Sequence, residues 1–209
     1  DGHVRRDRDD PPRDLLVVGV TGTNGKTTTS YLVESGLRAA GHRTGMIGTV
    51  ETRIGDDRVA SERTTPEAPE VHALLALMRE RGITACVMEV SSHALVYGRV
   101  DGIVFDVAGF TNLSRDHLDF HADLEDYFAA KASLFTPGRS RRGVVVVDDE
   151  YGRRLASRKG AVAVTTVSTQ GGAADWRVVS REPAAGSTRI VVEDGHGSRL
   201  ALTSPIPGA

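Results

Sequence analysis

An apolar run at residues 15–20, LLVVGV, leads directly into a glycine-rich segment, T-G-T-N-G-K-T-T at residues 21–28. A short continuous apolar run that ends in a glycine-rich turn is typical of a buried parallel strand. The residues that follow, with Leu32 and Leu37 before Gly41, favour a helix. A strand, a loop and a helix in this order form one half of a crossover to the next parallel strand, so the segment predicts an α/β fold.

The same alternation of strand and helix continues along most of the chain. Further strands are expected near 44–50, 83–90, 103–110, 144–148 and 161–167, and helices near 67–81, 123–135 and 150–159. The turn Gly55-Asp56-Asp57 predicts a hairpin that reaches towards Ser61. Three short strands then follow at 176–182, 188–194 and 199–204, without room for crossover helices. We therefore predict an α/β fold with a P-loop-containing, mainly parallel sheet flanked by helices, and an antiparallel β appendage at its C-terminal end.

Charge and cysteine content narrow the class of protein. The 209 residues carry 26 Lys and Arg against 28 Asp and Glu, a net charge of −2, which gives no electrostatic footprint for nucleic acid. No apolar run approaches the roughly 18 residues of a membrane-spanning helix, and residues 1–14 are charged and read as a linker or disordered lead-in. Cys86 is the only cysteine, which excludes an intramolecular disulfide. We expect a monomeric cytoplasmic protein with no nucleic-acid partner and no membrane insertion.

The glycine-rich segment has the chemistry of a phosphate loop. Gly22 and Gly25 would let the backbone approach phosphate oxygens, Lys26 would pair with the β- and γ-phosphates, and the Thr27 hydroxyl would ligate Mg²⁺. The spacing departs from G-x-x-x-x-G-K-[ST], because Val20 stands where the first glycine is required. The alternative from the residues alone is an ordinary glycine-rich turn with an incidental lysine.

Five segments in order resemble one enzyme family. They are G-T-N-G-K-T-T (22–28), T-T-P (64–66), M-E-V-S-S-H-A-L (88–95), T-N-L-S-R-D-H-L-D-F-H (111–121) and D-Y-F-A-A-K-A-S-L-F (126–135). Together they resemble the Mur ligases, ATP-dependent amide-forming enzymes of peptidoglycan precursor synthesis, and among them the MurE type. The resemblance implies that residues 15–209 are the family's central ATP-binding domain, incomplete at its C-terminal end. The family's N-terminal uridine-binding and C-terminal amino-acid-binding domains are absent from the chain.

The resemblance also implies a reaction. Mg-ATP would transfer its γ-phosphoryl group to the side-chain carboxylate of D-glutamate in UDP-MurNAc-L-Ala-D-Glu. The amine of a diamino acid would then attack the acyl phosphate and release phosphate. The cofactors implied are ATP and Mg²⁺, and the partners are the UDP-MurNAc-dipeptide and the diamino acid.

Site residues carry over from the family's motifs position by position. The ATP-binding positions would be Gly22, Thr23, Asn24, Gly25, Lys26, Thr27 and Thr28. The metal ligands would be Thr27, Glu89, His117 and a carbamylated Lys131, whose CO₂ adduct would turn a cation into an anionic oxygen ligand. Lys26, Lys131 and His117 would be catalytic. The dipeptide contacts would be Thr64, Thr65, Ser91 and Arg99, and Asn112 would approach phosphate or metal.

Several of these residues also have simpler interpretations. Glu89 at a strand end is either a magnesium ligand or a solvated side chain. Most of Asp116, His117, Asp119, His121 and Asp123 would be a solvated helix entry, with Asp123 near the N-cap. Lys131 would be an ordinary exposed helix lysine, and T-T-P-E a helix N-terminus.

Two alternative functions stay open from the sequence. One is another Mur-like ligase of the folylpolyglutamate or cyanophycin synthetase type, which the S-S-H-A-L and D-H-L-D-F-H segments disfavour. The other is a non-catalytic Mur-like nucleotide-binding module. The subunit of this kind in the lipid II amidating complex typically carries a four-cysteine zinc insertion, and a single cysteine rules that insertion out.

Overall fold

The computed structural model describes residues 15–116 and 119–204. Within them one continuous sheet of eleven strands runs in the order β11-β10-β9-β8-β7-β6-β1-β5-β2-β3-β4. The strands of its parallel part are β2 (Thr44–Ile47), β5 (Ala85–Glu89), β1 (Leu16–Thr21), β6 (Phe105–Phe110), β7 (Ser140–Val146) and β8 (Val164–Ser168). The predicted mainly parallel sheet is confirmed.

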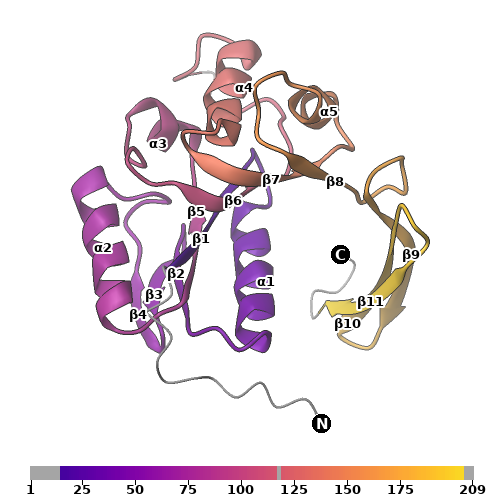
Figure 1. Cartoon of the computed structure of the whole chain (residues 1–209), viewed down its shortest axis with the longest axis horizontal. Coiled ribbons are helices and arrows are strands. Elements are labelled where there is room, and N and C mark those ends of the chain that lie inside the picture. The colour runs from indigo at the N-terminus through magenta and orange to yellow at the C-terminus, as the bar shows by residue number, and fades with distance from the viewer. Residues whose placement is uncertain (1–14, 117–118, 205–209) are drawn as a thin grey trace.

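Helices cover both faces of the parallel strands (Figure 1). They are α1 (Lys26–Ala39), α2 (Ala68–Glu80), α3 (Ser92–Val96), α4 (Leu124–Ala132), which continues into a 3₁₀ turn at Ser133–Phe135, and α5 (Glu150–Ala156). The larger core packs under α2, α4 and α5, and a smaller one, with Val18, Val20 and Val87, packs against α1. In the part of the chain that the structure describes, no helix combines the length and apolar character needed to cross a membrane.

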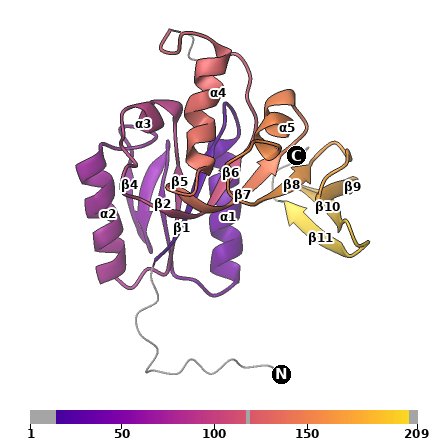
Figure 2. The same cartoon turned by 45° about the horizontal axis from the view of Figure 1, so that its top comes forward.

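The sheet ends in antiparallel strands on both sides. On one side the predicted hairpin forms from β3 (Glu51–Ile54) and β4 (Asp57–Ala60). On the other side β9 (Trp176–Ala184), β10 (Ser187–Asp194) and β11 (Arg199–Ser204) form an antiparallel ribbon that extends away from α2 (Figure 2). The ribbon joins the main sheet through a short parallel pairing of Val167 and Ser168 with β9. The C-terminal appendage is therefore antiparallel, as predicted, and continuous with the sheet.

Several local expectations differ from the structure. Strand β2 ends at Ile47 rather than at 50, and α5 ends at Ala156 rather than at 159. Strand β7 begins at Ser140 rather than at 144, and β8 begins at Val164 rather than at 161. The start of β7 is polar, S-R-R, so apolar patterning missed it, although Ser140 is buried and its hydroxyl donates to the Leu134 carbonyl. Helix α3 was not expected, because its five residues are too few for a helical period to show in the sequence.

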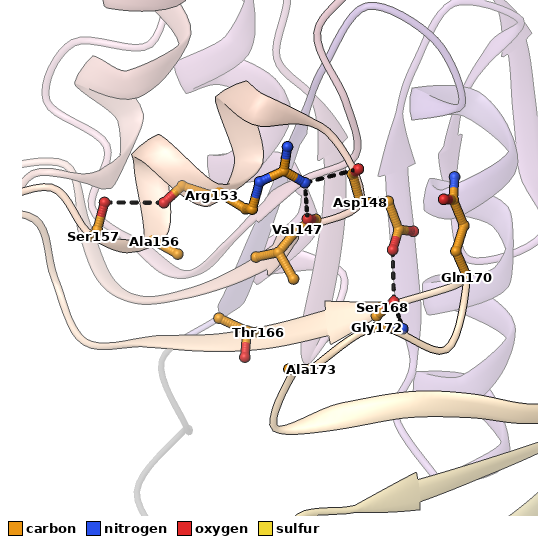
Figure 3. A pocket seen from close by; sticks show the side chains of 10 residues that line it. All are labelled: Val147, Asp148, Arg153, Ala156, Ser157, Thr166, Ser168, Gln170, Gly172 and Ala173. Carbon is orange, nitrogen blue, oxygen red and sulfur yellow. Dashed lines mark hydrogen bonds between the residues drawn. The ribbon is translucent and has the colours of Figure 1, made fainter.

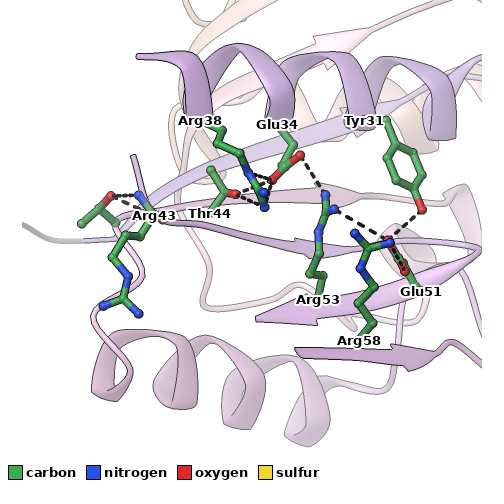
Figure 4. Close-up of polar contacts among 9 residues, drawn as sticks. Tyr31, Glu34, Arg38, Arg43, Thr44, Glu51, Arg53 and Arg58 are labelled. Atoms are coloured by element: carbon green, nitrogen blue, oxygen red, sulfur yellow. Dashed lines mark hydrogen bonds and ion pairs between the residues drawn. The ribbon is translucent and has the colours of Figure 1, made fainter. Parts of the chain in front are cut away.

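A buried ion-pair network ties the β3–β4 hairpin to α1 (Figure 4). The Arg53 guanidinium on β3 lies 2.8 Å from the Glu34 carboxylate on α1, and each side chain is only 6 % exposed. Glu34 also contacts Arg38 and the Thr44 hydroxyl, and the Tyr31 hydroxyl donates to Glu51 at 3.0 Å. The hairpin and the helix that follows the phosphate loop are thereby held in one position relative to each other.

Candidate active site

The loop of residues 22–25 leaves the carboxyl end of β1 and enters α1. Gly22 and Gly25 have φ values of 146° and 82°, a region that favours glycine. A Cβ on Gly22 would lie 1.9 Å from the Thr111 hydroxyl oxygen, so this glycine is required by close packing as well as by its φ. The loop therefore has the tight shape expected of a phosphate loop, with the first N–H groups of α1 pointing out of the helix.

The segment after β6 grips this loop from one side. The Thr23 amide donates to the Asn112 carbonyl at 2.9 Å, and the Asn24 amide donates to the Asn112 side-chain oxygen at 3.0 Å. The Asn112 side-chain NH₂ returns a hydrogen bond to the Asn24 carbonyl at 3.1 Å. These contacts use the amides of Thr23 and Asn24, which leaves the amides from Gly25 to Thr28 as the donors best placed for phosphate. Asn112 thus shapes the loop, and its approach to phosphate or metal stays a prediction.

Two lysines converge on the carbonyl oxygen of Gly22. Lys26 Nζ donates to it at 3.0 Å and to the Thr23 carbonyl at 2.9 Å, and Lys131 Nζ donates to it at 2.9 Å. Lys131 is 1 % exposed and lies over the Tyr127 ring, so the interpretation of an exposed helix lysine is wrong. Burial, and then the charge of Lys26, lower the pKa of Lys131 to about 7, against the opposing effect of Asp116. The structure therefore holds an amine that is partly neutral near pH 7.

Glu89 is the carboxylate of the site. It ends β5 and is 1 % exposed, so it is not the solvated strand-end residue that the sequence left open. The Thr27 hydroxyl donates to its Oε2 at 2.9 Å, and the Thr49 amide donates to its Oε1 at 2.9 Å. The first turn of α1 and the end of β5 thus bring the two expected oxygen ligands, Thr27 and Glu89, together.

The oxygen donors fit Mg²⁺ with a nucleotide better than an all-protein metal site. In the part of the chain that the structure describes, no group of three or more His, Cys, Asp and Glu side chains is arranged to hold a metal ion. Mg²⁺ is typically held by one or two carboxylates together with substrate phosphates, so one carboxylate and one hydroxyl beside a phosphate loop suffice. His117, the expected third ligand, lies outside the described residues.

The expected dipeptide contacts cluster beside Glu89 but differ in availability. The Thr65 hydroxyl donates to the Glu89 carbonyl at 2.8 Å and accepts from the Ser91 amide at 3.2 Å, so this 1 % exposed residue mainly fixes the backbone. Ser91 caps α3, since its hydroxyl accepts from the Ala94 amide at 3.1 Å. Arg99 pairs with Glu67 at 2.8 Å and donates to the Thr65 carbonyl at 3.3 Å. Thr64 is half-buried, and its hydroxyl lies 3.1 Å from that of Thr49.

The segment before α4 is only partly the solvated helix entry that we expected. Asp123 is the N-cap, accepting from the Asp126 amide at 2.8 Å, as predicted, and Asp116 and Asp119 are exposed. His121 is 2 % exposed, so the solvated interpretation is wrong for this residue. Its ring lies 4.8 Å from Phe120 and 4.9 Å from Tyr127, and Nδ1 pairs with Asp126 at 3.0 Å.

Two residues of the candidate site, Thr49 and Tyr127, were not singled out from sequence patterns. Tyr127 lies under Lys131, and its hydroxyl is 3.3 Å from that of Thr23. Its position four residues before Lys131 puts both on one face of α4, which was the available signal. Thr49 follows strand β2 at the same sheet edge as Glu89, and strand order, which the sequence does not show directly, is what makes them neighbours.

A cavity of about 630 Å³ opens elsewhere, at the carboxyl ends of β7 and β8 (Figure 3). Its carboxylate, Asp148, accepts from the hydroxyls of Ser168 and Thr169 at 2.7 Å, and Arg153 donates to the Val147 and Asp148 carbonyls. Asp148 and Arg153 of this cavity are therefore both engaged by neighbouring groups of the protein.

Comparison with known proteins agrees with this geometry. A relative in Streptomyces coelicolor, named UDP-N-acetylmuramoyl-L-alanyl-D-glutamate–2,6-diaminopimelate ligase, is 60 % identical over 199 residues, which are 95 % of this chain and 39 % of the relative. One of the same name in Streptomyces avermitilis is 57 % identical, with the same coverage. A solved structure of a ligase of that name has a TM-score of 0.82 and 29 % identity, covering 93 % of this chain and 40 % of its own.

The chain thus spans about two fifths of the length of these relatives. Residues 20–209 match the family described as Mur ligase middle domain. This match covers the last two residues of β1, the phosphate loop, all later strands, Glu89 and Lys131. The chain therefore belongs to the Mur ligase family, in which it corresponds to the middle domain.

Proposed function

We propose that this chain is the ATP- and magnesium-binding central part of a ligase of peptidoglycan precursor synthesis. The ligase would add a diamino acid to UDP-MurNAc-L-Ala-D-Glu. The observation that carries the proposal is the convergence of Lys26, Lys131, Thr27 and Glu89 around one phosphate loop. The names of the relatives support the acceptor, and they also support 2,6-diaminopimelate as the added amino acid.

The reaction needs positioning and charge neutralisation more than a protein nucleophile. A carboxylate oxygen of D-glutamate forms a bond to the γ-phosphorus of ATP while the bond to ADP breaks. The amine nitrogen then attacks the acyl carbon, phosphate leaves, and the nitrogen loses a proton. Lys26 and the amides from Gly25 to Thr28 would hold the phosphates during the first step.

Thr27 and Glu89 would hold magnesium, with His117 as a further ligand. When bound, the ion supplies positive charge that neutralises the phosphate oxygens. The buried Glu89 carboxylate is kept in one orientation by its contacts with Thr27 and Thr49. These contacts within the protein orient the carboxylate before any metal ion binds.

Lys131 would carry the carbamate that the family resemblance implies. Carbamylation requires a neutral amine, and the lowered pKa and burial of Lys131 supply one. In the unmodified protein two cations share the Gly22 carbonyl, whereas a carbamate on Lys131 would replace their repulsion with attraction to Lys26. Crystal density for Lys131 in a nucleotide complex tests this: a bare amine distant from the metal would contradict it.

Thr64, Ser91 and Arg99 would contact the UDP-MurNAc-dipeptide, and Thr65 would order the segment that carries them. We expect the reaction in the cytoplasm, where ATP and UDP-linked precursors are available, and we expect a monomer. A ligase of the folylpolyglutamate type is the second candidate, because ATP-dependent amide formation on a different acid would use the same phosphate loop.

A chimera tests the proposed reaction. The matching segment of the Streptomyces coelicolor relative is replaced by this chain, and tripeptide formation from UDP-MurNAc-dipeptide, ATP and 2,6-diaminopimelate is measured. We expect activity in the chimera and its loss in the chimera with Lys26→Ala. A folded chimera that binds ATP but leaves the UDP-MurNAc-dipeptide unreacted, with either 2,6-diaminopimelate or L-lysine, would contradict the proposal.

A further inference from the structure

The bend at residues 48–50, between β2 and β3, lies against the Glu89 carboxylate. Thr49 is exposed to solvent, yet both its polar groups bond to Glu89: the amide donates to Oε1 at 2.9 Å and the hydroxyl lies 2.9 Å from Oε2. A Cβ on Gly48 would come within 2.5 Å of Oε1, so the backbone passes close to the carboxylate. An exposed threonine whose amide and hydroxyl both bond to a buried carboxylate points to a role in the site rather than in the core.

The Thr49 hydroxyl also links two parts of the site. Its oxygen lies 3.1 Å from the Thr64 hydroxyl as well as 2.9 Å from Glu89. A threonine hydroxyl has one hydrogen, and an ionised carboxylate only accepts. The geometry makes Thr49 the donor in both contacts, so its one hydrogen serves either Glu89 or Thr64. The Thr49 hydroxyl is therefore shared between the segment proposed to bind the acyl substrate and the carboxylate proposed to bind the metal.

The bend itself is held in place. Strand β3 begins at Glu51, whose carboxylate accepts from Tyr31 on α1, and Arg53 of the same strand pairs with Glu34. Helix α1 carries Thr27, the other donor to Glu89, in its first turn. Thr27 and Thr49 thus contact the carboxylate from two elements that the buried ion pair locks together.

We propose that Thr49 is a positioning residue, which orients Glu89 for magnesium and, through Thr64, couples the metal site to the acyl-substrate segment. The inference rests on the proposed function, because it takes Glu89 as a metal ligand. Removing the hydroxyl leaves the hydrogen bond from the Thr49 amide to Oε1 but removes the hydrogen bond from Thr49 to Oε2. Such outer contacts change metal affinity without touching the metal.

The test is magnesium-dependent binding of a non-hydrolysable ATP analogue to the chain, measured by titration calorimetry at graded Mg²⁺. For Thr49→Val we expect the Mg²⁺ concentration for half-maximal binding to rise about tenfold. Thr49→Ser keeps the hydroxyl and should stay within about twofold of the unsubstituted chain. Thr52→Val is the matched control, because Thr52 lies on the same hairpin and faces Ser61 instead. Analogue binding in EDTA should be equal in all four proteins, which a merely structural role would not predict.

Thr64→Val tests the coupling. Alone it should lower the half-maximal Mg²⁺ about threefold, because the Thr49 hydrogen then serves Glu89 alone. Combined with Thr49→Val it should add nothing further, since the shared hydroxyl is already gone. Effects that multiply in the double variant would overturn the coupling.

The outcomes separate this inference from the proposed function. An unsubstituted chain that binds the analogue equally with Mg²⁺ and with EDTA overturns the metal site itself, and Thr49 with it. A magnesium-dependent chain in which Thr49→Val titrates normally overturns the role of Thr49 alone. If Thr49→Val does not fold by circular dichroism, the smaller Thr49→Ala gives the same comparison.

Discussion

Charged residues lie in two contrasting settings on the same sheet. In the body of the domain Lys131, Glu89, Glu34 and Arg53 are buried, and each contacts a specific partner. In the β9–β11 ribbon, Glu193 is also largely buried, but it pairs with Arg177 and Arg199, whose side chains are 47 % and 66 % exposed. Ion pairs that look alike as contacts therefore differ in energy, because water screens the second group and not the first.

The largest expected effect is on catalysis, after replacement of the buried Lys131. Lys131→Met in the chimera should lower the rate of tripeptide formation about a thousandfold, because it removes a preorganised charge from the proposed phosphoryl-transfer site. It should not lower the melting temperature, since burying a methionine avoids the desolvation of a buried amine. The exposed Lys159→Met is the control, and we expect it to leave the rate unchanged. A Lys131→Met chimera that retains full activity would contradict the proposed role of Lys131.

Breaking the Glu34–Arg53 pair should be the largest effect on stability. Arg53→Ala leaves the buried Glu34 with only the half-exposed Arg38 as a cationic partner and should cost about 3–5 kcal/mol in free energy of unfolding. Denaturant unfolding measures this. Replacing both residues, Glu34→Gln with Arg53→Met, should recover most of the loss, because no buried charge then remains. A loss below about 1 kcal/mol in Arg53→Ala would mean that this pair behaves like an exposed one.

The low pKa of Lys131 predicts a pH-dependent stability. The folded protein releases the proton near pH 7, whereas the unfolded chain holds it up to about 10.5. Between these values the unfolded state binds more protons, so the free energy of unfolding rises with pH. Lys131→Met lacks this term, and its stability advantage over the unsubstituted protein should shrink from pH 7 to pH 10. A constant difference across this range would contradict the low pKa.

A glycine in the ribbon should be far more tolerant than one in the phosphate loop. Gly186 has a φ of 71° and open space around it, so Gly186→Ala should cost only about 1 kcal/mol and leave ATP binding intact. Gly22→Ala also meets the Thr111 hydroxyl at 1.9 Å and should abolish ATP binding. Thermal unfolding and nucleotide titration of the two variants measure the contrast, and equal losses would contradict it.

The smallest effect should come from the exposed ion pairs. Arg199→Ala removes one of two arginines on Glu193 and should change the free energy of unfolding by less than about 0.5 kcal/mol. Added salt should reduce even that difference. A loss of unfolding free energy as large as that in Arg53→Ala would show that the ribbon depends on its ion pairs as much as the β3–β4 hairpin does.

Local patterns sufficed to predict most of the fold. The apolar runs, the turn at Gly55 and the helical spacing of Val71, Leu75 and Met78 each specify an element from neighbouring residues. These patterns could not predict the start of β7, where the polar segment S-R-R lies in a strand. The Ser140 hydroxyl donates to the Leu134 carbonyl there, a contact that the local sequence does not indicate. The five-residue α3 is likewise fixed by a cap, Ser91, and not by a period.

Residues of the candidate site could be predicted where their immediate neighbours in the sequence indicate their role. Lys26 and Thr27 follow the glycine loop directly, and Glu89 ends an apolar strand. The burial of Lys131 and His121 could not be deduced locally, because it results from α4 packing over the phosphate loop. Thr49 depends on β2 lying beside β5, which only the folded sheet establishes.

The most direct test of the account is whether the carboxyl edge beside Lys26 and Glu89 binds ATP through magnesium. Titration calorimetry of the chain with a non-hydrolysable ATP analogue measures this in Mg²⁺ and in EDTA. We predict binding that is much tighter in Mg²⁺ than in EDTA, that is lost in Lys26→Met, and that in Glu89→Gln falls in Mg²⁺ to about its level in EDTA. Equal binding in Mg²⁺ and in EDTA, or binding that neither substitution changes, would contradict the assignment of this edge as the magnesium and ATP site.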